Sequence, residues 1–197
     1  MVFSIWTGRR AAPTRPARFA ALQQVRAYWE GLRRGGQVPL RAAVDPRGIA
    51  AVLDQVFMAE RIGPGLARFR IAGMQINQLC GAEVRGLPLS LLIAPAARSQ
   101  FAATLERVFA QGSLAEIAVE AETGLGRPGL EGRLLLLPLA GPDGATDLCL
   151  GCLALEGDIA RTPRRFVLRA AVEQATRPAS AAAPAPFRPK PTLRLVP

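Results

Sequence analysis

The chain has 197 residues, of which 50% are hydrophobic, and its 25 basic and 15 acidic side chains give a net charge of +10. This length suits one domain with a single core. The sequence contains no histidine, which excludes histidine-ligated haem and any serine or cysteine nucleophile that a histidine base activates.

The positive charge is concentrated at the two ends of the sequence. Residues 1–34 carry a net charge of +6, residues 35–157 carry −2 and residues 158–197 carry +6. Arginine-rich flanks attract phosphates and anionic lipids, so binding of nucleic acid or of an anionic surface through them is one hypothesis. The other is that these flanks only solubilise an apolar body.

The sequence predicts a cytoplasmic protein. Three cysteines are an odd number, too few for a disulfide framework, and fit a reducing compartment. Arg9 and Arg10 form a twin arginine, but a hydrophobic region does not follow them, which argues against a signal peptide. The apolar runs are far shorter than the roughly 18 residues of a membrane helix, so no transmembrane segment is expected.

The sequence predicts two helices within the first 55 residues. Residues 1–15 contain several Ala, Arg and Pro residues, and we expect a flexible N-terminus there. Within 16–34, apolar residues recur every three or four positions, which predicts an amphipathic helix ended by a glycine pair. Asp45 and Pro46 suit the N-cap and first turn of a short helix that runs to about Gln55.

Two strands are expected next, over 56–62 and 66–72, joined by a Gly-Pro-Gly turn. Alternation in the second strand predicts that Phe69 and Ile71 share one face. The same alternation places Arg68 and Arg70 on the other face.

Helical elements follow these strands, at 74–79, at 88–93 and, most clearly, over 95–111. The last of these has a buried stripe and ends at a glycine. The residues of that stripe are Phe101, Leu105, Val108 and Phe109.

Strands are then expected at 114–122, 131–139 and 146–155, and a final helix from Thr162 to about Thr176. Residues 176–197 are rich in Ala and Pro, which predicts a disordered tail. The predicted fold class is α+β: one five-stranded antiparallel sheet with helices on one face, an N-terminal amphipathic helix and a C-terminal helix, within residues 16–175.

This order of elements, with the Gly81, Glu83 and Gly86 pattern, resembles a PAS domain, and more specifically a compact PAS-like family of alphaproteobacteria. The likeness covers about residues 20–156. The matching residues are Tyr28, Trp29, Leu32, Arg33, Pro39, Asp45, Pro46, residues 68–73, 79–81, Glu83, Gly86, residues 135–139, Leu150 and Gly151. The resemblance implies a sensory or protein-interaction module in bacterial signalling, without catalytic residues, so we do not expect an enzyme.

Three patterns have better structural explanations than catalytic ones. Residues 124–129 match G-x-G-x-x-G, but a proline and a strand pattern follow, which favours a hairpin loop over a nucleotide site. Cys149 and Cys152 lie three apart in an apolar strand, so their side chains are expected to be buried on opposite faces. A face with Glu116, Glu120 and Glu122 is expected to be solvated.

A cleft between the sheet and the long helix is the expected ligand site, and its candidate residues are Phe69, Arg70, Phe101 and Leu105. Arg70 has an alternative role, since it could pair with Glu83. The cofactor is unknown: the sequence lacks a metal-ligand set and the cysteine segment of flavin-adduct PAS domains.

The candidate interface with a partner is the stripe Phe19, Leu22, Val25 and Trp29. The alternative is that Trp29 anchors the N-terminal helix on the sheet. The expected partners are a second copy of the chain, another signalling protein or a small molecule.

Overall fold

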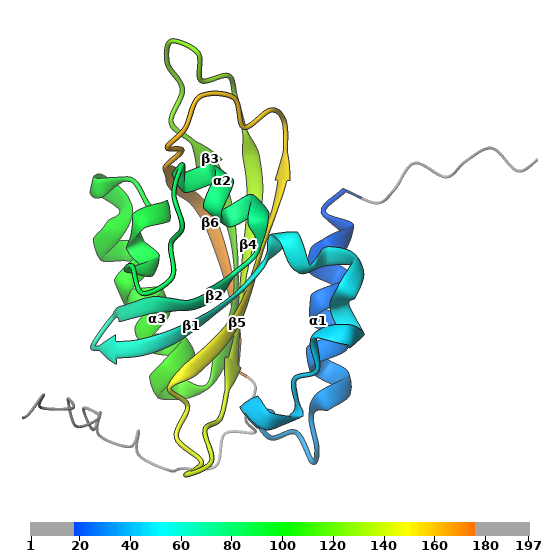
Figure 1. Cartoon of the computed structure of the whole chain (residues 1–197). Coiled ribbons are helices and arrows are strands. Elements are labelled where there is room, and N and C mark those ends of the chain that lie inside the picture. The colour runs from blue at the N-terminus through cyan, green and yellow to red at the C-terminus, as the bar shows by residue number, and fades with distance from the viewer. Residues whose placement is uncertain (1–17, 176–197) are drawn as a thin grey trace, which may run out of the picture.

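The computed structural model describes residues 18–175 and centres on a six-stranded antiparallel sheet with the order β2-β1-β5-β4-β3-β6 (Figure 1). The five pairings between neighbouring strands are all antiparallel. The strands are β1 (Val56–Gly63), β2 (Leu66–Ala72), β3 (Ser113–Ala121), β4 (Glu131–Leu139), β5 (Leu148–Glu156) and β6 (Phe166–Ala175). The flexible N-terminus expected over 1–15 and the disordered tail expected over 176–197 lie outside the described residues.

Helices cover both faces of this sheet, rather than one face as predicted. On one side lie α1 (Ala20–Leu32) and the 3-10 helices η1 (Arg41–Ala43) and η2 (Pro46–Gln55) (Figure 1). On the other lie α2 (Met74–Cys80), α3 (Arg98–Gln111) and two short 3-10 turns, η3 (Leu89–Leu92) and η4 (Pro95–Ala97). Asp45 caps η2, because its side chain accepts a hydrogen bond from the Arg47 N–H.

The prediction of a C-terminal helix is wrong, since residues 166–175 form β6 and pair with β3 from Ser113 to Ala121. The segment contains good helix formers, but most of its side chains are exposed, so a helix would bury little apolar surface. As a strand it supplies hydrogen bonds to the open edge of β3. It also makes the sheet six-stranded instead of five-stranded.

The predicted alternation in β2 is wrong beyond Phe69. A β-bulge at Arg70 shifts the register: Phe69 pairs with Ala59, whereas Ile71 pairs with Met58. Because adjacent residues of β1 point to opposite faces, the extra residue turns Ile71 away from Phe69. Phe69 is buried, but Ile71 is 57% exposed on the face that carries α1 and η2.

Each face of the sheet has its own core. The core under α2 and α3 includes Phe57, Phe69, Phe101 and Ile117. On the opposite face, Leu22, Val25 and Trp29 of α1 pack against apolar side chains of β4 and β5. The Trp29 ring N–H donates a buried hydrogen bond of 2.9 Å to the Pro138 carbonyl oxygen, which fixes α1 on the sheet.

Two glycines that flank α2 have clear backbone roles. Gly81 ends α2 in the left-handed region at φ 71°, where a side chain would be strained. A Cβ at Gly73 would lie 2.3 Å from the Leu53 carbonyl oxygen and 2.4 Å from that of Asp54. Gly73 therefore lets the end of β2 approach the end of η2.

Candidate functional site

The predicted ligand residues Phe69, Phe101 and Leu105 do come together, on the face of the sheet that α2 and α3 cover. This face is called the helix side below. Each is at most 1% exposed and belongs to the core there. The Phe57 ring lies edge-on to Phe69, with 5.4 Å between ring centroids. These side chains pack against one another, so the space in which we expected a ligand contains hydrophobic core.

Arg70, the fourth predicted ligand residue, lies apart from them. Its guanidinium is 3.5 Å from the Glu60 carboxylate, which also accepts a hydrogen bond of 2.9 Å from Arg68. Glu60 is buried, so the positive charge of the two arginines offsets part of the cost of burying its carboxylate. The structural pairing expected for Arg70 exists, but with Glu60 instead of Glu83.

Most of the predicted interface residues lie on the side of α1 that faces the sheet. Leu22, Val25 and Trp29 are buried against the chain's own sheet, and Phe19 is partly buried beside them. The Arg18 and Arg133 guanidinium groups lie 5.0 and 6.0 Å from the centre of the Phe19 ring. The anchoring role considered for Trp29 is thus confirmed, and the stripe as a contact with a partner stays a prediction.

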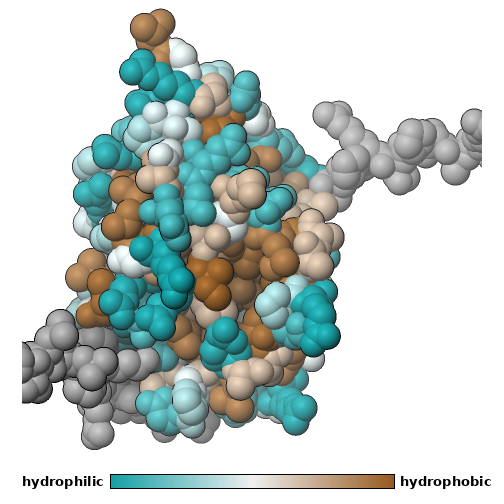
Figure 2. Space-filling model, viewed as in Figure 1, coloured by the Kyte–Doolittle hydropathy of each residue, from teal (hydrophilic) through white to brown (hydrophobic). Residues whose placement is uncertain are grey.

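An apolar groove lies on the same face of the sheet, between η2 and the strands β1 and β2. Its volume is about 350 Å³. Figure 2 shows apolar surface at the centre of this view, over the sheet beside α1 and η2. The residues that line it are Arg41, Val44, Pro46, Ile49, Leu53, Asp54, Val56, Phe57, Met58, Ile71, Ala72, Gly73 and Leu150.

Sequence reasoning missed this groove because two of its causes are not local. The bulge at Arg70 turns Ile71 toward the groove, and Gly73 sets the approach of η2 to β2. The exposed Leu53 belongs to η2, whose apolar side is only partly buried. The short helix expected from Asp45 to about Gln55 was the one available signal, and the structure has it as the 3-10 helix η2.

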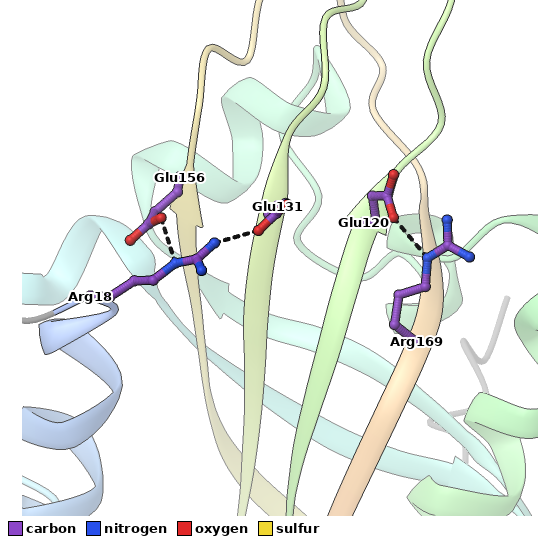
Figure 3. A network of polar contacts seen from close by, with 5 residues as sticks. All are labelled: Arg18, Glu120, Glu131, Glu156 and Arg169. Carbon is purple, nitrogen blue, oxygen red and sulfur yellow. Dashed lines mark hydrogen bonds and ion pairs between the residues drawn. The ribbon is translucent and has the colours of Figure 1, made fainter.

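A second hollow, of about 430 Å³, is polar and lies over the ends of β3, β4 and β5. Three carboxylates stand in a row across these strands, because Glu120 pairs with Glu131 and Glu131 with Glu156 in the sheet register. Figure 3 shows Arg18 between Glu131 and Glu156, and Arg169 beside Glu120. These ion pairs offset most of the negative charge of the row, and they link the start of α1 to β4 and β5, and β6 to β3.

The acidic strand face is solvated as expected, and two of its three carboxylates, Glu116 and Glu120, are also in ion pairs. Glu116 and Glu120 are partly exposed, and Glu122 is exposed. The Arg26 guanidinium is 3.7 Å from the Glu116 carboxylate. Arginines of the basic flanks, namely Arg18, Arg26 and Arg169, are therefore used within the described part of the molecule.

The cysteine pair and the glycine loop have the structural roles that were predicted. Cys149 belongs to the core under α2 and α3, whereas Cys152 belongs to the core under α1. Burial raises the pKa of each thiol to about 12. Gly124 and Arg127 form a tight turn through mutual backbone hydrogen bonds, and the strand β4 follows.

Two further features are absent from residues 18–175. That part of the chain contains no group of three or more His, Cys, Asp or Glu side chains placed to hold a metal ion. None of its helices is both long enough and apolar enough to span a membrane.

The antiparallel sheet with helices on both faces is an α+β fold. A family model described as PAS domain matches residues 17–154. The chain therefore belongs to the PAS domain family, and the match ends before β6. A search of curated proteins found no match.

Three light-oxygen-voltage (LOV) proteins are among the solved structures with partial likeness. A variant of RsLOV has 20% identity and a TM-score of 0.40, over 55% of this chain and 65% of that chain. An RNA-binding light-oxygen-voltage receptor has 16% identity and a TM-score of 0.39, over 62% of this chain and 35% of that one. A fungal LOV domain photoreceptor has 17% identity and a TM-score of 0.36, over 58% of this chain and 93% of that one. This chain thus spans less than two thirds of the length of the RsLOV variant and of the RNA-binding receptor.

Proposed function

We propose that this PAS domain is a regulatory module in bacterial signalling that binds a partner protein or a small ligand in the apolar groove, without catalysis. A single observation carries the proposal. The helix-side space is occupied by Phe57, Phe69, Phe101 and Leu105, while the groove over β1 and β2 stays open to apolar contacts. An exposed apolar groove on a sheet that helices otherwise cover is a typical binding surface for a ligand or a partner protein.

The absence of catalysis is part of this proposal. The sequence provides no histidine base. The carboxylates that stand together on β3, β4 and β5 are held in ion pairs with Arg18 and Arg169. A ligand or partner can therefore act only through its different affinity for two states of the domain.

The cellular setting is proposed from the sequence. The residues shared with compact alphaproteobacterial PAS proteins favour that group. The three cysteines, free in the described structure, fit the cytoplasm.

Methyl-labelled NMR with an apolar probe tests the site. Indole, added to the full chain at low protein concentration, is expected to shift the methyl signals of Ile49, Met58 and Ile71, which line the groove. The signals of Ile76 and Ile117, in the helix-side core, should not move. Leu53→Glu should abolish the shifts by placing a charge on the wall of the groove. Shifts confined to Ile76 and Ile117 would contradict the proposal.

A further inference from the structure

The volume of the groove points to a small molecule as its occupant. At about 350 Å³, it lies at the lower end of the roughly 300–1,000 Å³ that small-molecule sites in proteins enclose. Its lining residues come mainly from η1, η2 and the strands β1, β2 and β5, so an occupant would touch several elements at once. The groove is therefore of a size for one small ligand.

Most of the lining is apolar. Leu53 of η2 is 40% exposed and Ile71 of β2 is 57% exposed, while Ile49 and Met58 are buried. An apolar body that covers Leu53 and Ile71 removes their surface from water, which favours binding roughly in proportion to the area covered. The main part of a ligand for this groove is therefore apolar.

One cation also lines the groove. Arg41 of η1 is partly buried, and it takes part in no ion pair within residues 18–175. Arg47, six residues further on, is paired with Asp45. A guanidinium beside apolar surface forms its strongest contact with a carboxylate, which it can bind through two parallel hydrogen bonds.

The backbone places Arg41 at one end of the strands that line the groove. Its N–H donates a hydrogen bond of 2.8 Å to the Ala140 carbonyl oxygen. Ala140 directly follows β4, whose last residue, Leu139, pairs with Leu148 at the start of β5. Arg41 is thus anchored level with the start of β5.

The one acidic lining residue, Asp54, is anchored at the other end. It precedes β1 by one residue, and the first residue of β1, Val56, pairs with Cys152. Four residues of β5, a length of about 13 Å, separate Cys152 from Leu148. A ligand with an anionic group at Arg41 can therefore turn its apolar body, and not its charge, toward Asp54.

We propose that the groove binds a small amphipathic carboxylate, with its apolar body over Leu53 and Ile71 and its carboxylate group paired with the Arg41 guanidinium. This inference rests on the proposed function, in which the groove is the binding site, and it names the class of ligand. Such a ligand touches η1 and η2 as well as β2. It therefore favours the state of the domain in which these elements lie close together.

Two probes with the same apolar body test the carboxylate preference: 3-phenylpropionate, and 3-phenylpropan-1-ol, which has a hydroxyl group in its place. Each is titrated at pH 7 into the full 197-residue chain, and the methyl signals of Ile49, Met58 and Ile71 are followed by NMR. Both probes should shift these signals. The acid is expected to bind about fivefold more tightly than the alcohol, the effect of a strong, partly exposed ion pair.

Substitution of the arginine tests its role. Arg41→Gln should make the two probes bind equally, whereas Arg41→Lys, which keeps the charge, should retain part of the preference. The matched control is Arg47→Gln, because the Arg47 side chain is 92% exposed and does not line the groove. This control should keep the full fivefold preference. Circular dichroism confirms that each variant is folded before the titration.

The inference is overturned if the wild-type chain binds the acid no more tightly than the alcohol. It is also overturned if Arg41→Gln keeps the preference, or if Arg47→Gln loses it, since general positive charge would then explain the result. Equal binding of both probes, with shifts at the groove methyls, overturns the carboxylate preference alone. A groove that responds neither to these probes nor to indole overturns the proposed function as well.

Discussion

At the scale of single residues, Gly151 shows how tightly the helix-side core is built. It lies opposite Phe57 in the pairing of β1 with β5. A Cβ at this position would lie 2.0 Å from the Phe57 ring, which is itself packed against Phe69. The ring is only 1% exposed, so a Cβ at Gly151 would have to displace it against its buried neighbours.

We therefore predict that Gly151→Ala destabilises the protein by roughly 1–3 kcal/mol, the usual range for overpacking a core. Urea unfolding measures this. Gly31→Ala in α1 is the control, because nothing lies within 4 Å of its Cβ position. It should stabilise the helix by roughly 0.5–1 kcal/mol. Equal effects of the two substitutions would show that Phe57 can move aside.

The cysteines provide a second prediction at this scale. Burial raises the pKa of Cys80 to about 11 and those of Cys149 and Cys152 to about 12. Only the thiolate reacts with disulfide reagents, and its population at pH 8 is then a small fraction of that in a free cysteine. A thiol-disulfide reagent should label the folded protein about a hundredfold more slowly than the urea-unfolded chain. Rapid formation of a disulfide between Cys149 and Cys152 would contradict their separation on two faces of the sheet.

At the scale of elements, α3 and β6 are joined by one ion pair. The Arg107 guanidinium donates to the Glu173 carboxylate with a distance of 2.6 Å, and Thr104 donates to the same carboxylate. The hydrogen bond from Arg107 lowers the pKa of Glu173 below its usual value. Since β6 has few buried side chains, this contact fixes a strand that packing alone holds weakly.

A lowered pKa means that the folded state favours the ionised carboxylate. The stabilisation is present above the unfolded-state pKa of about 4.3 and is lost as the pH falls through the lower folded-state value. We predict that Glu173→Gln reduces the free energy of unfolding at neutral pH, and that its difference from wild type vanishes in acid. Urea unfolding at several pH values measures it. Glu122→Gln, at an exposed site without an ion pair in the described structure, should show no such dependence.

The elements predicted correctly from the sequence are those with a clear local pattern. Apolar residues at helical spacing identified α1 and α3, alternation identified β3, and a continuous apolar run identified β4; both strands were placed within one residue at each end. β6 was missed because its residues prefer a helix locally, and only the unpaired edge of β3 makes them a strand. The candidate site was missed for a similar reason, since Ile71 reaches the groove through a bulge that alternation alone does not reveal.

At the scale of the whole molecule, the placement of the helices that pack on the two faces of the sheet explains where binding is expected. α2 and α3 cover one face, where three of the four residues that sequence reasoning assigned to a ligand, Phe69, Phe101 and Leu105, are buried in the core. α1 and η2 cover the opposite face over β4 and β5 but leave the groove over β1 and β2. The family resemblance predicted the sheet and its helices, whereas the open surface depends on how far each covering element reaches.

The distribution of charge leads to the last prediction. Residues 1–17 carry three arginines and residues 176–197 carry four basic side chains, and neither stretch contains an acid. The remaining residues, 18–175, have a net charge of only +3, and many of their arginines are in ion pairs. Any attraction to a polyanion should therefore come from the two end segments.

We predict that the full chain binds heparin and double-stranded DNA without sequence preference, and that binding weakens steeply as salt is raised. Changing the seven basic residues of the end segments to Gln in the full chain should lower the slope of log K against log salt by several units, because fewer counterions are released. Fluorescence anisotropy at a series of salt concentrations measures both slopes, and an unchanged urea midpoint confirms that the variant is folded. Binding that survives this neutralisation would place the contact within residues 18–175. A wild-type chain that fails to bind even at low salt would show that the end charges only increase solubility.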